Sequence, residues 1–141
     1  MKRLHVHIHV DDVEESTRFY TTLFGVPPAV REHDYAKWML EDPRVNLAIS
    51  TKCGAKGVDH LGIQVESREA LGEIADRLTA AERAIVEQTD AACCYARSDK
   101  AWAADPQGVA WETFFTHDGI TTYGDDTIAT EALPRSRAAT P

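Results

Sequence analysis

Residues 4–10, LHVHIHV, alternate strictly between apolar side chains and histidines. This alternation predicts a strand whose apolar face packs beneath a helix and whose histidines face the other way. Asp12 and Glu15 follow with the spacing of a capping box, which predicts the start of a helix. Gly25 is a typical residue at a helix C-terminus. Between these limits larger side chains recur at helical spacing: Val13, Thr17, Tyr20 and Phe24.

Two later segments each predict a hairpin. The segment AKWMLEDPRVNLAIS, residues 36–50, has the pattern of two short strands joined by a turn at Asp42-Pro43. The segment KAWAADPQGVAWETFF, residues 100–115, has the same pattern and turns at Asp105-Pro106. Both turns therefore use the same Asp-Pro step.

The strand and helix are also repeated, so the chain is an internal duplication. The segment VDHLGIQVES predicts a second strand over residues 58–65, and Ser67 can cap a second helix. That helix carries three apolar residues on one face: Leu71, Ile74 and Leu78. A shift of 55 residues lays the first strand and helix on the second and places His5 on His60.

The duplication predicts an α+β fold of two tandem βαβββ modules, over about residues 3–52 and 57–116. We expect their strands to form a curved mixed sheet, a cup with the helices outside. Both modules belong to a single domain, residues 1–116. Residues 117–141 lack clear periodicity, and we interpret them as a C-terminal tail that is mobile or lies across a partner.

Composition narrows the class of protein. The chain has 141 residues, 43% hydrophobic and 27% charged, which is typical of a globular domain. Its net charge of −8 disfavours a nucleic-acid partner, because proteins that bind nucleic acids usually carry a clustered basic patch on their surface. No stretch approaches the ~20 apolar residues of a membrane span, and the N-terminus lacks the apolar core of a signal peptide. We therefore expect a cytoplasmic protein without a membrane partner.

Four histidines lie on the two predicted module-opening strands. The 55-residue shift pairs His5 with His60, whereas His7 falls on a glycine and His9 on a glutamine. We therefore interpret His5 and His60 as metal ligands and assign His7 and His9 to the cavity lining. A structural histidine buried in the core is the alternative for His60.

Glu112 is the candidate third ligand. The two hairpins align with a shift of 63 residues, which places Glu112 on Ile49 in the last strand of each half. Such strands can bring Glu112 close to His5 and His60. Two imidazoles and one carboxylate form the ligand set of non-haem Fe(II) oxygenases, and zinc also fits these ligands. A solvated strand carboxylate is the alternative for Glu112.

These segments resemble the vicinal oxygen chelate superfamily, which includes glyoxalase I, extradiol dioxygenases and bleomycin- and fosfomycin-resistance proteins. LHVHIHVDDVEESTRFYTTLFG and DHLGIQVES stand where that superfamily has its two strand-borne ligands, and WETF stands where it has the closing carboxylate. In glyoxalase I a fourth ligand is near the position of Ile49. The isoleucine here argues against the glyoxalase reaction.

The segment TDAACCYARSDKAWAADPQGVAWETFF is similar to one subgroup, the organoarsenical carbon–arsenic lyases and the related cadmium-induced proteins. The resemblance covers residues 3–116. It implies an Fe(II)-dependent lyase of the dioxygenase type that uses O2 to cleave trivalent organoarsenicals and releases arsenite. Zn, Ni, Mn or Co could replace iron in the same ligand set. It also implies a homodimer, because paired modules of this kind usually dimerise.

Cys93 and Cys94 are the candidate substrate-binding residues. Three cysteines are too few for a disulfide scaffold, and a bond between adjacent cysteines would be strained, so we expect free thiols. Thiolates are soft ligands that suit trivalent arsenic. Adjacent cysteines can hold one ion only in a loop or turn, because mid-strand they point to opposite faces. QTDAACCYA has such a composition, although two small core residues are the alternative.

Three further residues are candidates for the same pocket. Tyr95 and Lys100 are close in sequence to the cysteine pair and are interpreted as substrate contacts. Cys53, between the two modules, could supply a third thiol or be an incidental loop residue.

Two other functions stay open. One is a thiol-based arsenite- or cadmium-binding resistance protein without turnover. The other is a different metal-dependent enzyme of the glyoxalase/dioxygenase superfamily.

Overall fold

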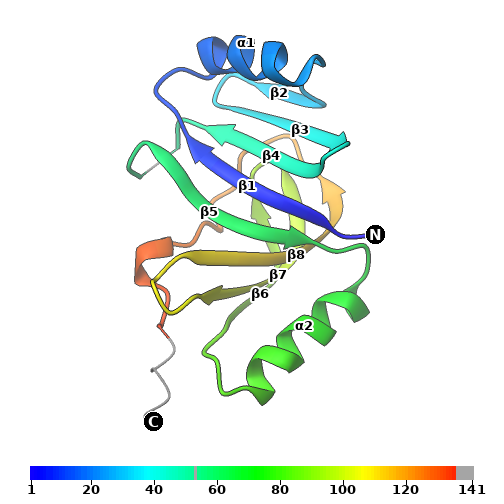
Figure 1. The fold of residues 1–141 in the computed structure, drawn as a ribbon, viewed down its shortest axis with the longest axis vertical. Helices are drawn as coiled ribbons and strands as arrows, with labels where there is room; N and C mark the ends of the chain where they lie inside the picture. The colour runs from blue at the N-terminus through cyan, green and yellow to red at the C-terminus, as the bar shows by residue number, and fades with distance from the viewer. Residues whose placement is uncertain (53, 136–141) are drawn as a thin grey trace. The chain divides into compact units, whose positions relative to one another are not determined.

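The computed structural model describes residues 1–52 and 54–135, so the candidate thiol Cys53 lies outside the described residues. The chain comprises two compact units (Figure 1). The first unit is Arg3–Leu61, and the second joins residues 1–2 to the chain from Gly62 onward. None of the described helices is long and apolar enough to cross a membrane.

The first unit contains one helix and the strands around it. Its elements are β1 (Arg3–His9), α1 (Val13–Phe24), β2 (Val30–Glu32), β3 (Tyr35–Glu41), β4 (Arg44–Ser50) and the start of β5 (Gly57–Gln64). The first four strands follow the order β2-β3-β4-β1. β1 pairs with β4 in parallel, and the other two pairs are antiparallel. The sequence did not predict β2, because three residues are too few to show a period.

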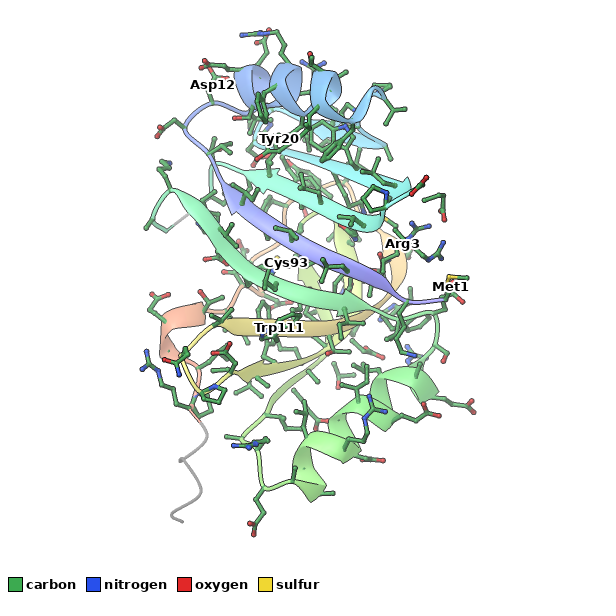
Figure 2. The ribbon with its side chains drawn as sticks, in the orientation of Figure 1. Met1, Arg3, Asp12, Tyr20, Cys93 and Trp111 are labelled. Atoms are coloured by element: carbon green, nitrogen blue, oxygen red, sulfur yellow. The ribbon has the colours of Figure 1, made fainter. Side chains whose placement is uncertain are left out.

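The limits of α1 are those that the capping residues predict. The Asp12 side chain accepts a hydrogen bond from the backbone N–H of Glu15 at 3.0 Å. Gly25 ends the helix in the left-handed conformation at φ 72°, which glycine adopts without steric cost. α1 lies against β3 and β4 (Figure 1). Tyr20 projects from α1 toward the strands, where its ring is 5.7 Å from that of Trp38 (Figure 2).

The core of the first unit confirms the predicted two faces of β1. Its buried members are Val13, Ala36, Trp38, Leu47 and Ile49. Val6 and Ile8 of β1 pack against them, and so does Val10 just beyond the strand, whereas Leu4 at the start of β1 is exposed. Because side chains alternate along a strand, the histidines of β1 lie on the opposite face.

The second unit has the same order of elements. It contains the rest of β5, α2 (Arg68–Ala80), β6 (Val86–Cys93), β7 (Ala96–Ala104), β8 (Ala110–Gly119) and a short 3-10 helix, η1 (Thr130–Ala132). β7 pairs in antiparallel fashion with both β6 and β8. Ser67 caps α2 by accepting the N–H of Ala70 at 3.1 Å, as predicted. α2 packs on β7 and β8 (Figure 1) over buried Val65, Leu71, Ile74, Ala75 and Ala101.

Each unit thus follows the order strand, helix and three strands, which confirms the predicted α+β fold of two βαβββ modules. One local prediction needs correction. The residues before the second hairpin, interpreted as a loop, form most of β6, with a register shift between Gln88 and Ala91. Strand order places β6 at the end of the sheet. Polar residues are compatible with such a position, and they hid the strand from the hydrophobic pattern.

The segment after β8 packs against the second unit as far as the structure describes it. Ile120 donates its N–H to the Tyr95 carbonyl at 3.0 Å, and Asp126 donates its N–H to Ala92 at 3.1 Å. Leu133 is buried in a small core with Trp102, Ala104 and Ala110. This part of the predicted tail therefore covers the turn between β6 and β7.

Candidate functional site

Three buried histidines of the first unit form what we call the histidine cluster: His5, His7 and His60. Each offers a ring nitrogen, and these nitrogens all lie within 4.8 Å of one another. His5 and His7 come from the same face of β1, and His60 comes from β5. The sequence predicted His5 and His60 together, but it did not place His7 with them.

Hydrogen bonds orient the rings of His5 and His60. Nδ1 of His5 is 3.1 Å from the carbonyl oxygen of Asn46, and Nδ1 of His60 is 2.6 Å from Oδ2 of Asp59. Both partners are acceptors, so each Nδ1 carries the proton and each Nε2 carries the lone pair in the neutral ring. The two Nε2 atoms lie 3.2 Å apart. Two lone pairs directed at each other suit a shared cation, and an oxygen partner on the other ring nitrogen is usual for metal-ligating histidines.

The remaining histidines of β1 occupy different surroundings. Nε2 of His7 lies 2.8 Å from Oγ of Ser50, and its ring centre is 5.0 Å from that of His60. His9 is next along the same face, with Nδ1 3.8 Å from Oδ1 of Asp59. His9 is not a member of the histidine cluster. The predicted lining role of His7 and His9 stays a prediction.

The alignment of Glu112 with Ile49 was wrong. Ile49 is fully buried in the core beneath α1, on the face of β4 away from the histidines. Counting from the turn of each hairpin, the third residue of β8 is Glu112 and the third residue of β4 is Asn46. Asn46 pairs with His5 in the β1–β4 register, and its Oδ1 is 3.3 Å from Nδ1 of that histidine. The side-chain amide of Asn46, rather than Ile49, therefore occupies the position equivalent to Glu112, where the fourth ligand of glyoxalase I was expected. The alignment failed because the turn between β7 and β8 is longer than the turn between β3 and β4.

Five residues of the second unit form what we call the thiol cluster: Cys93, Cys94, Lys100, Glu112 and Tyr123. Cys93 ends β6, and Cys94 and Tyr95 form the turn to β7 with φ angles of 59° and 61°. Two consecutive positive φ angles are typical of a tight hairpin turn. The turn lets the adjacent side chains point the same way, with their Sγ atoms 2.8 Å apart. Both are free thiols, as predicted.

The two thiols have different proton affinities. The hydrogen bond from Cys93 lowers the pKa of Cys94 from its ordinary 9.0 to about 7, against the effect of burial, and Lys100 and Tyr123 lower it further. The same hydrogen bond, together with burial, raises the pKa of Cys93 far above its usual range. Above about pH 7 the pair therefore holds one proton, with the negative charge on Cys94.

Lys100 and Glu112 form a buried ion pair. Nζ of Lys100 lies 3.6 Å from Oε2 of Glu112, and each side chain is at most 7% exposed. Burial alone would lower the pKa of Lys100, but the Glu112 carboxylate and the two cysteines raise it above its ordinary value. Lys100 thus stays positively charged next to the thiols, and its Nζ is also 5.8 Å from the Trp102 ring centre.

The structure brings the predicted residues together in two groups. Cys93, Cys94, Lys100 and Glu112 share the thiol cluster, while His5 and His60 share the histidine cluster. Tyr95 lies in the cysteine turn, and its ring centre is 5.7 Å from that of Tyr123. Its contact with a substrate stays a prediction.

Sequence reasoning missed several residues that belong to the two clusters or contact them. Tyr123 lies 3.6 Å from Sγ of Cys94, but it belongs to a segment without a periodic pattern. Asn46 and Ser50 were missed because their roles depend on the register between β1 and β4. Asp59 could have been found from the sequence, because it directly precedes the candidate ligand His60 and an acidic residue there can orient the histidine ring.

Comparisons with known proteins show which sequences are similar to this chain. The family model described as "Glyoxalase/Bleomycin resistance protein/Dioxygenase superfamily" matches residues 2–113. The chain is 43% identical over 121 residues to a trivalent organoarsenical cleaving enzyme of Bacillus sp. (strain MD1), a match that covers 82% of this chain and 74% of that protein. It is 33% identical over 125 residues to the cadmium-induced protein CadI of Mycobacterium bovis, with 88% and 82% covered.

Solved structures show the same fold. An extradiol ring-cleaving dioxygenase from B. fuscum aligns with a TM-score of 0.63 at 16% identity, over 84% of this chain and 33% of the dioxygenase. A Mn(II)-bound glyoxalase from Novosphingobium aromaticivorans aligns with a TM-score of 0.60 at 15% identity, over 95% of this chain and 46% of the glyoxalase. The chain thus spans a third to a half of these two larger proteins.

Proposed function

The chain belongs to the Glyoxalase/Bleomycin resistance protein/Dioxygenase superfamily, and we propose that it cleaves the carbon–arsenic bond of trivalent organoarsenicals as an Fe(II)-dependent lyase of the dioxygenase type. The observation that carries this proposal is the pair Cys93 and Cys94, whose Sγ atoms are 2.8 Å apart and share one proton. The relative that is named for this activity supports the same substrate class.

The thiol cluster binds the arsenical. The thiolate of Cys94 attacks arsenic and displaces one hydroxide, and the proton of Cys93 leaves with the second hydroxyl group when the second As–S bond forms. The overall binding step, RAs(OH)2 plus two thiols, gives RAs bound to two sulfurs and two waters. The hydrogen bond from Cys93, with help from Lys100, lowers the pKa of Cys94 to about 7, so part of the attacking thiolate is present at neutral pH before the substrate arrives.

The histidine cluster supplies ligands for the metal. We propose His5, His60 and Glu112 as the two-histidine, one-carboxylate set, and the fit rests on the two Nε2 lone pairs that face each other. Asn46 and Asp59 hold these rings in the tautomer that a metal requires. Fe(II) bound there would supply the activation of O2. Mn, Zn, Ni or Co would suit the same donor atoms.

The proposed reaction balances with O2 as the only oxidant. For a methylarsenical, CH3As(OH)2 and O2 give CH2O and As(OH)3. The carbon–arsenic bond breaks, four electrons pass from carbon to O2, and arsenic stays trivalent. Release of arsenite therefore requires O2 and no further reductant.

The test uses the full chain, loaded with Fe(II) without oxygen and given methylarsenite and then O2. We expect arsenite and formaldehyde in equal amounts from the loaded protein and none without Fe(II) or O2. Cys94→Ser should abolish the product. His33→Ala is the control, because His33 is 86% exposed and belongs to neither cluster.

One outcome would favour a second function. If the arsenical binds to Cys93 and Cys94 but no arsenite forms, the protein is a thiol-based binder of arsenite or cadmium, as the cadmium-induced relative suggests. If neither binding nor cleavage occurs, a different metal-dependent reaction of the superfamily replaces our proposal.

We further propose a cytoplasmic homodimer, because the thiols must stay reduced and paired modules commonly dimerise. Its mass in solution tests the dimer.

A further inference from the structure

His7 is the member of the histidine cluster that the proposed ligand set does not use. It is buried, and its ring centre lies 5.0 Å from that of His60 and 6.2 Å from that of His5. A ring nitrogen of His7 lies within 4.8 Å of a ring nitrogen of each of the other two. Three imidazoles thus converge within the first unit.

The spacing suits a single ion. Two imidazole nitrogens bound to one metal at about 2.1 Å in tetrahedral geometry are about 3.4 Å apart. Nε2 of His5 and Nε2 of His60 are already 3.2 Å apart. The third nitrogen is within 4.8 Å of both, so it has to move closer to the other two to complete the set.

Each of the three rings also has an oxygen partner. Asn46 accepts from His5, Asp59 accepts from His60, and Ser50 contacts His7 at 2.8 Å. Metal-ligating histidines are oriented in this way through their second ring nitrogen. His9, on the same strand face, lies 3.8 Å from its nearest acidic oxygen and is excluded from the cluster. His7 therefore has the surroundings of a metal-ligating histidine, whereas His9 does not.

We propose that His5, His7 and His60 form a three-imidazole site in which His7 is a further ligand of the divalent cation, in addition to the proposed set of His5, His60 and Glu112. The idea rests on the proposed function only in placing the ion at His5 and His60. Three imidazoles suit late first-row ions such as Co²⁺, Ni²⁺ and Zn²⁺. Glu112, which lies 3.6 Å from Nζ of Lys100 in the second unit, stays the proposed carboxylate ligand.

The test measures Co²⁺ binding by the metal-free full-length chain. Competition with a chromophoric chelator gives the affinity, and proton NMR counts the paramagnetically shifted imidazole N–H signals, one for each histidine ligand. We expect three such signals in the wild type and in Glu112→Gln, because that substitution leaves the three imidazoles in place. His7→Ala should lose one signal and at least about tenfold in affinity. His33→Ala is the control, and His7→Asn serves if the alanine variant does not fold.

The possible failures separate the two proposals. Two shifted signals in the wild type, with unchanged affinity in His7→Ala or His7→Asn, would overturn the role of His7 and leave the ligand set of the proposed function intact. Absence of Co²⁺ binding by the wild type would overturn both. Three signals in a protein that releases no arsenite would support the three-imidazole site and remove the lyase.

Discussion

Nε2 of His5 lies 3.2 Å from Nε2 of His60, although 55 residues separate them in the chain. The two rings come from equivalent strands of the two modules, β1 and β5. Acceptors on the far side of each ring leave the lone pairs facing inward. Internal duplication has therefore produced a pair of donors with matching orientation, which a single histidine could not provide.

Asp59 should set the metal affinity of this pair. Its carboxylate is 2.6 Å from Nδ1 of His60 and both orients the ring and raises the basicity of Nε2. We expect Asp59→Asn to weaken Co²⁺ binding about 10–100-fold without changing the fold. Asp11→Asn is the matched control, since the Asp11 side chain is 87% exposed. Competition titrations measure both. Equal affinities in the two variants would show that Asp59 has no role in the site.

Cys94 should react as a thiolate near neutral pH. Its pKa is lowered to about 7 by the hydrogen bond from Cys93, with help from Lys100 and Tyr123. We expect the rate of alkylation by iodoacetamide to rise through a midpoint near pH 7. Cys93→Ala removes the hydrogen-bond donor, so its midpoint should move toward the ordinary value of 9.0. Mass spectrometry of the modified peptide assigns the site. A midpoint near 9 in the wild type would contradict the shared proton.

The shared proton also predicts how stability depends on pH. Between about pH 7 and 9 the unfolded chain holds two thiol protons and the folded chain holds one, so stability rises with pH. Above pH 9 the unfolded thiols lose their protons while Cys93 keeps its own, so stability falls. The rise should be on the order of 1–2 kcal/mol. Urea unfolding of the wild type and of Cys93→Ala/Cys94→Ala measures the difference, which should show a maximum near pH 9.

Much of the fold follows from the sequence, because its signals are local. Asp12, Gly25 and Ser67 mark helix ends through contacts within a few residues, and these contacts occur. The alternation in β1 correctly places Val6 and Ile8 on the face that packs against the core of the first unit. The repeat identifies His5 and His60 as a pair without any knowledge of strand order.

What the sequence could not supply depends on register. His7 contacts Ser50 on the parallel strand β4, and no local pattern predicts this parallel pairing. Ile49 was misplaced because the second hairpin has the longer turn, so a fixed shift moves residues to the wrong face of the strand. Tyr123 reaches Cys94 through an irregular segment.

The buried pair of Lys100 and Glu112 should be worth more than an ion pair on the surface. Removing one member of a buried pair leaves the other charge in a poorly solvated place, which typically costs about 3–5 kcal/mol. Lys100→Met should therefore destabilise the protein by about 3 kcal/mol, and Lys100→Met/Glu112→Gln should cost clearly less than the sum of the single changes. The single change Lys100→Met should also raise the pKa of Cys94, because the nearby ammonium is lost.

The matched control is the exposed pair Arg18 and Glu14, whose side chains are 67% and 71% exposed and whose nearest N and O atoms are 3.3 Å apart. Water screens this pair, so Arg18→Met should change stability by no more than about 0.5 kcal/mol. Urea unfolding at pH 7 gives the free energy of unfolding of each variant, and a double-mutant cycle gives the coupling. A coupling between Lys100 and Glu112 as small as that of the surface pair would show that water reaches the buried charges.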